Sequence, residues 1–91
     1  MPLTLEDRRK IVEISREFGV KKLWIFGSAL DADSEPNDID LAVEGIPSDR
    51  FFKYYGRLFD ALSKPVDLVD MDSEAPIRHI VRKRGRVIFD E

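Results

Sequence analysis

Two aspartates separated by one residue, Asp38 and Asp40, lie inside an apolar, strand-like segment of this chain. Side chains at positions i and i+2 of a strand point to the same face, so Asp38 and Asp40 would stand side by side. Ile39 and Leu41 would point the other way, into a core. Two ionised carboxylates held this close repel each other unless a cation lies between them. Because oxygen ligands select hard ions, the pattern predicts a Mg²⁺ or Mn²⁺ site shared with substrate phosphates.

A third aspartate, Asp67, lies between Val66 and Leu68 in another alternating apolar segment. If the two strands are neighbours, Asp67 can face the same side as the first pair. Three carboxylates on adjacent strands can hold two metal ions about 3.5–4 Å apart, which stabilises the attacking and leaving oxygens in phosphoryl or nucleotidyl transfer. Asp67 would then be a metal ligand and a candidate for activating the incoming hydroxyl.

A phosphate site is predicted at Gly27 and Ser28, which follow the apolar segment Val20–Phe26. Glycine at a strand end allows close backbone approach, and free N–H groups with a serine hydroxyl can hold a phosphate. Gly-Ser alone begins many ordinary helices, and Asp-x-Asp alone is usually a solvated strand edge. In this order, with Asp67 in phase, the set indicates a metal–nucleotide site.

The composition restricts which chemistry such a site can use. With no cysteine and one histidine, the chain excludes disulfides, zinc–thiolate sites and a thiol nucleophile, so any metal must be held by oxygen. The net charge of −3 gives no general affinity for nucleic acid. A local basic cluster comprises Arg82, Lys83, Arg84 and Arg86. Its charges would stabilise a helix carboxyl end, or would contact a phosphate or a partner.

Ninety-one residues supply one core, so we expect a single domain over residues 1–91. No apolar stretch approaches the roughly 20 residues that span a bilayer, and the amino terminus lacks a signal-peptide pattern. We therefore expect a cytoplasmic protein without membrane contact.

The elements that must position the aspartates can be predicted from apolar spacing and stop signals. Helices are expected over Leu5–Phe18, Ser48–Ser63 and from Ser73 to Arg84, with Thr4, Ser48 and Ser73 as caps. Thr4 followed by Asp7 resembles a capping box, and Gly19 is the expected stop of the first helix. Strands are expected over Val20–Phe26, Ile39–Glu44, Val66–Val69 and Arg86–Phe89. A helical turn and loop is expected between Ser28 and Asn37. This order predicts a two-layer α/β or α+β domain with helices on a small sheet.

The sequence also predicts which other residues lie in the core, in loops or at the surface. The helix after Ser48 carries an apolar stripe that is expected to be core, with Tyr54 off the stripe as a contact residue. The stripe comprises Phe51, Phe52, Tyr55, Leu58, Phe59 and Leu62. Asp70 and Asp72 are expected to be loop carboxylates, because Asp70 has the parity opposite to Asp67. His79 is expected at the surface.

These motifs together resemble the signature of the minimal nucleotidyltransferases, the smallest members of the DNA polymerase β-like nucleotidyltransferase superfamily and antitoxin partners of HEPN toxins. The matching residues are Gly27-Ser28, then nine residues, then Asp38-Ile39-Asp40-Leu41, and later Pro65-Val66-Asp67-Leu68. The resemblance covers nearly the whole chain. It implies a mixed sheet flanked by helices and Mg²⁺-dependent transfer of a nucleoside monophosphate from a triphosphate. In the toxin–antitoxin branch it implies AMPylation, from ATP, of a tyrosine on the partner toxin.

Carried over by position, the resemblance assigns a role to each motif. Gly27 and Ser28 would contact the triphosphate, Asp38 and Asp40 would bind metal, and Asp67 would complete the triad. The implied partners are ATP and a HEPN-type toxin, in a homo- or hetero-oligomer.

The chain departs from this family where relatives often carry arginine and glycine after the Gly-Ser pair. It has Ala29-Leu30-Asp31-Ala32 there, so an acid replaces a cation beside the triphosphate. An alternative therefore stands beside catalysis, namely an antitoxin with a weak or inactive site that neutralises its toxin by binding.

Overall fold

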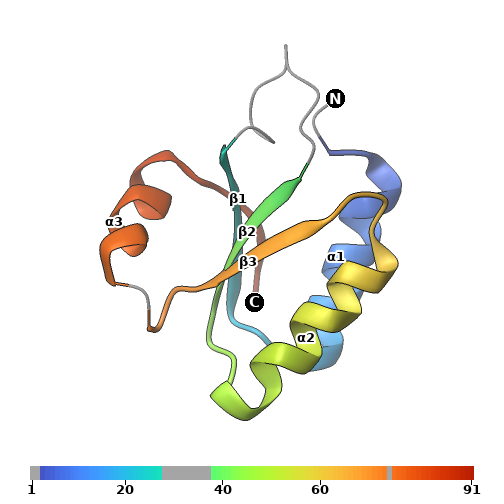
Figure 1. Ribbon diagram of the computed structural model, residues 1–91, viewed down its shortest axis with the longest axis horizontal. Helices are drawn as coiled ribbons and strands as arrows, with labels where there is room; N and C mark the ends of the chain where they lie inside the picture. Colours follow the sequence, from blue (N-terminus) through green and yellow to red (C-terminus); the bar gives the residue numbers. More distant parts are fainter. Residues whose placement is uncertain (1–2, 28–37, 74) are drawn as a thin grey trace.

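Figure 1 shows the computed structural model, which describes residues 3–27, 38–73 and 75–91. In this part of the chain the helices are α1 (Leu5–Phe18), α2 (Ser48–Ala61) and α3 (Ala75–Arg84). The strands are β1 (Lys22–Phe26), β2 (Ile39–Glu44), β3 (Val66–Asp70) and β4 (Arg86–Asp90). The helical turn and loop expected between Ser28 and Asn37 lies outside the described residues.

The described strands form one mixed sheet in the order β3-β2-β1-β4. β1 is antiparallel to β2 and β4, whereas β2 and β3 are parallel and are joined through α2, as a parallel crossover requires. α1 and α2 cover one face of the sheet, and α3 lies on the other (Figure 1). The predicted small mixed sheet flanked by helices is confirmed, and α3 adds a third layer to the two expected.

Alternation along the strands divides their side chains between two cores. The larger core lies between the sheet and helices α1 and α2, where Leu41 and Val43 are fully buried. It comprises Ile11, Ile14, Phe18, Val20, Leu23, Ile25, Ile39, Leu41, Val43, Ile46, Tyr54, Leu58, Leu62, Val66 and Leu68. The smaller core lies beneath α3 and comprises Trp24, Ala42, Met71 and Val81. β2 is therefore buried on both faces around Ala42. Its polar residues, Asp40 and Glu44, lie near its two ends.

The predicted element boundaries agree closely with the structure. α1 and β2 have the predicted limits, whereas β1 begins at Lys22, α2 ends at Ala61, and β3 and β4 each extend one residue further. Two signals act as predicted: Thr4 Oγ1 accepts a hydrogen bond from the Asp7 N–H at 3.0 Å, and Gly19 ends α1 with φ 68°. The Ser48 cap is wrong, because Pro47 occupies the cap position without a side-chain hydrogen bond. α3 begins at Ala75, after the predicted Ser73 cap.

The orientation of α2 differs from the prediction. Tyr54, expected as a contact residue, is fully buried, and its hydroxyl lies 2.7 Å from the Ser15 hydroxyl. Phe52 and Phe59, expected in the core, are 79% and 51% exposed. The apolar stripe is wider than the face that α1 and the sheet cover, so one flank of α2 keeps its aromatic side chains in contact with water.

Partly buried polar contacts fix α1 against the carboxyl end of α2. The Asp7 carboxylate, 3% exposed, accepts hydrogen bonds from the backbone N–H of Ser63, at 3.1 Å, and from the Ser63 hydroxyl. Lys10 Nζ donates to the carbonyl of Ala61 at 3.1 Å. These contacts cap the carboxyl end of α2 and set the point from which the chain enters β3.

None of the helices in the described residues is both long enough and apolar enough to cross a membrane.

Candidate active site

Asp40 and Asp67 lie side by side on the sheet. In the parallel β2–β3 ladder Asp40 is paired with Asp67, and in the antiparallel β1–β2 ladder it is paired with Phe26. Their parity places both carboxylates on the α3 side, next to Ala42 and Val69, while Leu41 and Leu68 enter the main core. The prediction that Asp67 faces the same side as Asp40 is confirmed.

The charges of this face are concentrated around Asp40. Its pKa is raised above the ordinary value, first because burial removes water from the carboxylate, and then because Asp67 and Asp38 add negative charge. Asp38 precedes β2 and is exposed, as is Asp67. The three predicted aspartates are therefore near enough to interact, with Asp40 the least hydrated of them.

Gly27 follows β1 and lies directly beside the Asp40 carboxylate. Its φ is 72°, in the left-handed region that favours glycine, and a Cβ placed there would overlap Asp40 Oδ2. Gly27 is thus required for a reason that the sequence did not reveal, namely space for a side chain on the neighbouring strand. Ser28, predicted to complete the phosphate site, lies outside the described residues.

The donor set fits a hard divalent cation. Carboxylate oxygens are the preferred ligands of Mg²⁺, and a cation would relieve the repulsion that Asp40 experiences. Across residues 3–27, 38–73 and 75–91, no three carboxylate or imidazole side chains are arranged closely enough to hold one ion. The Asp40–Asp67 pair is therefore the part of the predicted site that the fold brings together, and the three-ligand arrangement stays a prediction.

The basic cluster of α3 is oriented partly away from these carboxylates. Arg82 Nη2 pairs with Glu44 Oε2 at 3.1 Å, and both groups are solvent-accessible. Glu44 lies four residues beyond Asp40 on β2, which corresponds to about 13 Å along a strand. Arg82 therefore contacts β2 at the end of the strand opposite Asp40. His79 is exposed, as predicted.

The two further carboxylates near β3 have structural partners. Asp70, the last residue of β3, accepts a hydrogen bond from the Asp72 N–H at 3.0 Å, and Asp72 accepts one from the Gly45 N–H at 2.9 Å. The loop position expected for Asp72 is confirmed. Asp70 instead belongs to the strand, with the parity opposite to Asp67.

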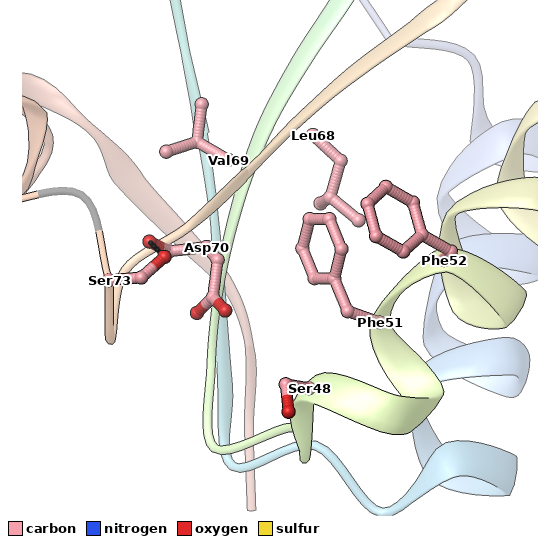
Figure 2. Close-up of a pocket in the computed structure, with 7 residues that line it drawn as sticks. All are labelled: Ser48, Phe51, Phe52, Leu68, Val69, Asp70 and Ser73. Atoms are coloured by element: carbon pink, nitrogen blue, oxygen red, sulfur yellow. Dashed lines mark hydrogen bonds between the residues drawn. The ribbon is translucent and has the colours of Figure 1, made fainter.

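A pocket of about 440 Å³ lies on the other side of β3, against α2. Figure 2 shows Phe51, Phe52 and Leu68 together on one side of it. Its remaining lining residues are Ser48, Val69, Asp70 and Ser73. The sequence reasoning missed this pocket, although the breadth of the apolar stripe on α2 was a signal of surplus aromatic surface.

The mixed sheet, with paired carboxylates beside a glycine that follows a strand, has the arrangement expected of a nucleotidyltransferase-type domain. A family profile described as "Polymerase beta, Nucleotidyltransferase" matches residues 9–91. The chain belongs to this family, as its motifs indicated.

Solved structures of the same fold come from toxin–antitoxin complexes. A toxin–antitoxin crystal structure with AMP-PNP matches at 25% identity with a TM-score of 0.77, over 92% of this chain and 73% of that one. The toxin–antitoxin MntA–HepT matches at 23% identity and TM-score 0.72, over 93% and 71%. A tri-AMPylated HEPN toxin from Shewanella oneidensis in complex with MNT antitoxin matches at 24% identity with a TM-score of 0.73. The match covers 93% of this chain and 71% of that one. Comparison with curated protein sequences finds no significant match.

Proposed function

We propose that this chain is the antitoxin of a toxin–antitoxin pair and transfers AMP from ATP to a tyrosine hydroxyl of its partner toxin. The observation that carries the proposal is the pairing of Asp40 with Asp67 on one face of the sheet, beside Gly27. Support for the nucleotide and the partner comes from the similar toxin–antitoxin structure with AMP-PNP, at 25% identity. A complex of the same fold contains a tri-AMPylated HEPN toxin, which supports the partner toxin as the protein that accepts AMP.

In this proposal Asp38, Asp40 and Asp67 hold Mg²⁺ or Mn²⁺, and Gly27 and Ser28 contact the triphosphate. The bound cations would supply charge neutralisation at the phosphates and at the developing alkoxide. Asp40 is held in place by the strand on each side of it and by contact with Gly27. Asp67 is exposed, so an acceptor hydroxyl can reach it from solvent.

The proposed reaction forms one bond and breaks one. The acceptor oxygen attacks the α-phosphorus of ATP, the bond from that phosphorus to the bridging oxygen breaks, and pyrophosphate leaves. The hydroxyl proton passes to Asp67, which acts as the general base. The product is a phosphodiester between AMP and the partner's side chain.

The second candidate is neutralisation by contact alone. It is favoured by Asp31, an acid where related sequences place a cation near the triphosphate. An anion at that position would oppose nucleotide binding through like-charge repulsion. In this case the nucleotidyltransferase fold would serve only as a binding scaffold.

A transfer assay tests the proposed chemistry. The protein is incubated with Mg²⁺, labelled ATP and the product of the neighbouring reading frame, and label on that product is measured. We expect label with the wild type and with Asp60→Asn, an exposed carboxylate of α2, and a loss of at least about 100-fold with Asp40→Asn. Equal labelling by the Asp40 and Asp60 variants would contradict the assigned site.

Toxin neutralisation in cells separates the two candidates. If neutralisation requires transfer, Asp40→Asn loses protection while Asp60→Asn retains it. Full protection by Asp40→Asn would instead establish that contact is sufficient.

A further inference from the structure

The pocket between α2 and β3 has an apolar side and a polar side. Phe51, Phe52 and Leu68 supply the apolar side, and Phe51 and Phe52 meet edge to face with their centroids 5.4 Å apart. The Asp70 carboxylate and the hydroxyls of Ser48 and Ser73 supply polar groups, as Figure 2 shows. Among the described residues that line the pocket, none is basic. An occupant that complements this lining has an apolar group next to a positive charge.

Phe52 marks the side from which this pocket is reached. It lines the pocket and yet is 79% exposed, so its ring is an apolar surface that the described residues leave uncovered. Aromatic residues, Phe among them, are enriched in protein interfaces relative to the rest of the surface. The volume of about 440 Å³ has room for an aromatic or branched aliphatic side chain.

The place of the pocket on the sheet suits a protein that also presents an acceptor to the carboxylates. β3 is an edge strand, so a partner seated against it can reach both faces of the sheet. Asp67 lies three residues before Asp70, about 10 Å along the strand, and its side chain points to the opposite face. Contact at the pocket and chemistry at Asp67 are therefore separable.

We propose that this pocket anchors the partner toxin through an apolar side chain seated on Phe52 and an adjacent Lys or Arg that pairs with Asp70. The proposal rests on the proposed function for the identity of the partner. The negative charge of Asp70 favours a basic residue of the partner. The aromatic side of the pocket favours an apolar side chain of the partner. The carboxylates on the other face play no part in this contact.

Binding measurements with matched variants test the anchor. The dissociation constant between the full chain and the product of the neighbouring reading frame is measured by calorimetry for Phe52→Ala and Asp70→Asn. Phe59→Ala and Asp60→Asn serve as controls, because they change the same residue types on α2 outside the pocket lining. We expect Phe52→Ala to weaken binding at least about tenfold and Asp70→Asn about fivefold, with the Asp70 effect shrinking at high salt. Both controls should stay within about twofold of the wild type.

Several outcomes would overturn the anchor. Unchanged binding by Phe52→Ala, an equal loss with Phe59→Ala, or no binding by the wild type would each exclude it. A wild-type dimer in sedimentation that Phe52→Ala dissociates, with toxin affinity unchanged, would assign the pocket to a second copy instead. Circular dichroism of each variant verifies that folding is intact.

The transfer assay on the same proteins distinguishes this proposal from the proposed function. If the wild type binds tightly in a Phe52-dependent manner but transfers no label, the chemistry fails and the anchor stands. If label is transferred and Phe52→Ala leaves both transfer and affinity unchanged, the anchor fails and the chemistry stands.

Discussion

Asp40 of β2 and Asp67 of β3 are direct neighbours in the parallel ladder, so their carboxylates share one face of the sheet. Burial and the nearby charges of Asp67 and Asp38 raise the pKa of Asp40. A group whose pKa is raised on folding stabilises the folded state below its unfolded pKa, and that contribution is lost as the pH rises through its folded pKa. Above its raised pKa, the ionised Asp40 therefore destabilises the fold relative to its protonated form.

Asp40→Asn is expected to raise the free energy of unfolding at pH 7 by about 0.2–1 kcal/mol, because it removes a like-charge cross-strand pair. The gain should shrink as the pH falls through the raised pKa of Asp40 and should vanish below the ordinary Asp pKa of 3.8. Urea unfolding from pH 3 to pH 7 without divalent cations measures it. Asp60→Asn is the control, and an equal gain in that variant would attribute the effect to net charge.

Mg²⁺-ATP is expected to stabilise the wild type and not the Asp38→Asn/Asp40→Asn double variant. A ligand that binds only the folded state at 100 times its dissociation constant adds about 2.7 kcal/mol, or several degrees in the melting temperature of a small domain. Thermal unfolding with and without Mg²⁺-ATP measures the shift. The proposed nucleotide site is excluded if the double variant shows the full shift.

Gly27→Ala is expected to reduce AMP transfer by disturbing Asp40. The added Cβ would meet Asp40 Oδ2. The alanine would also have to adopt a φ of 72°, a backbone conformation that disfavours it. We expect roughly 1–2 kcal/mol of lost stability from the backbone alone. Gly19→Ala has a similar φ of 68° and open space around it, so it is the matched control for strain without the clash.

Transfer rates and unfolding free energies of the two glycine variants separate these effects. Both should lose stability, whereas only Gly27→Ala should lose transfer at temperatures where it is folded. Equal transfer by both variants would show that the contact between Gly27 and Asp40 does not position the carboxylate.

The regular features of this fold could be predicted because they depend on local periodicity. Alternation placed Ile39 and Leu41 in the core and Asp40 on the other face, and the phase of Asp67 followed from the same rule. Thr4 and Gly19 marked the ends of α1 for reasons within one helical turn. The single-domain organisation and the cytoplasmic location stay predictions.

The features that escaped prediction depend on contacts between distant segments. Gly27 needs its conformation beside a side chain that the β1–β2 register brings to it. Tyr54 is buried because Ser15 gives its hydroxyl a partner, whereas Phe52 lies on the flank of α2 that no described element covers. Nothing in the spacing along α2 distinguishes these two flanks.

Asp7 illustrates the same point and gives a stability prediction. Its position after Thr4 suggested a local cap, but its carboxylate accepts two hydrogen bonds from Ser63. Asp7→Ala should lower the free energy of unfolding by about 1.5–3 kcal/mol, because it removes the buried carboxylate that accepts hydrogen bonds from the Ser63 N–H and hydroxyl. Chemical unfolding measures the loss, with the exposed Glu13→Ala on α1 as control. A loss below about 1 kcal/mol would show that water replaces the carboxylate.

The buried hydroxyl pair of Ser15 and Tyr54 joins the two helices that cover the main core. Burial raises the pKa of Tyr54 to about 12, although the hydrogen bond to Ser15 lowers it. Since the folded value exceeds the ordinary 10.0, stability should fall as the pH rises from 10 to 12. Tyr54→Phe should remove the part of this stability loss that comes from Tyr54 ionisation. Urea unfolding at about pH 10 and about pH 12 would measure it.

At pH 7, Tyr54→Phe and Ser15→Ala should each cost about 1–3 kcal/mol, because each leaves the other hydroxyl buried without its partner. The double variant should cost less than the sum, with a coupling of about 0.5–3 kcal/mol, since no unpaired hydroxyl remains. A double-mutant cycle by chemical unfolding measures that coupling. Strictly additive losses would mean that the two hydroxyls stabilise the helices independently, and that the 2.7 Å contact contributes nothing of its own.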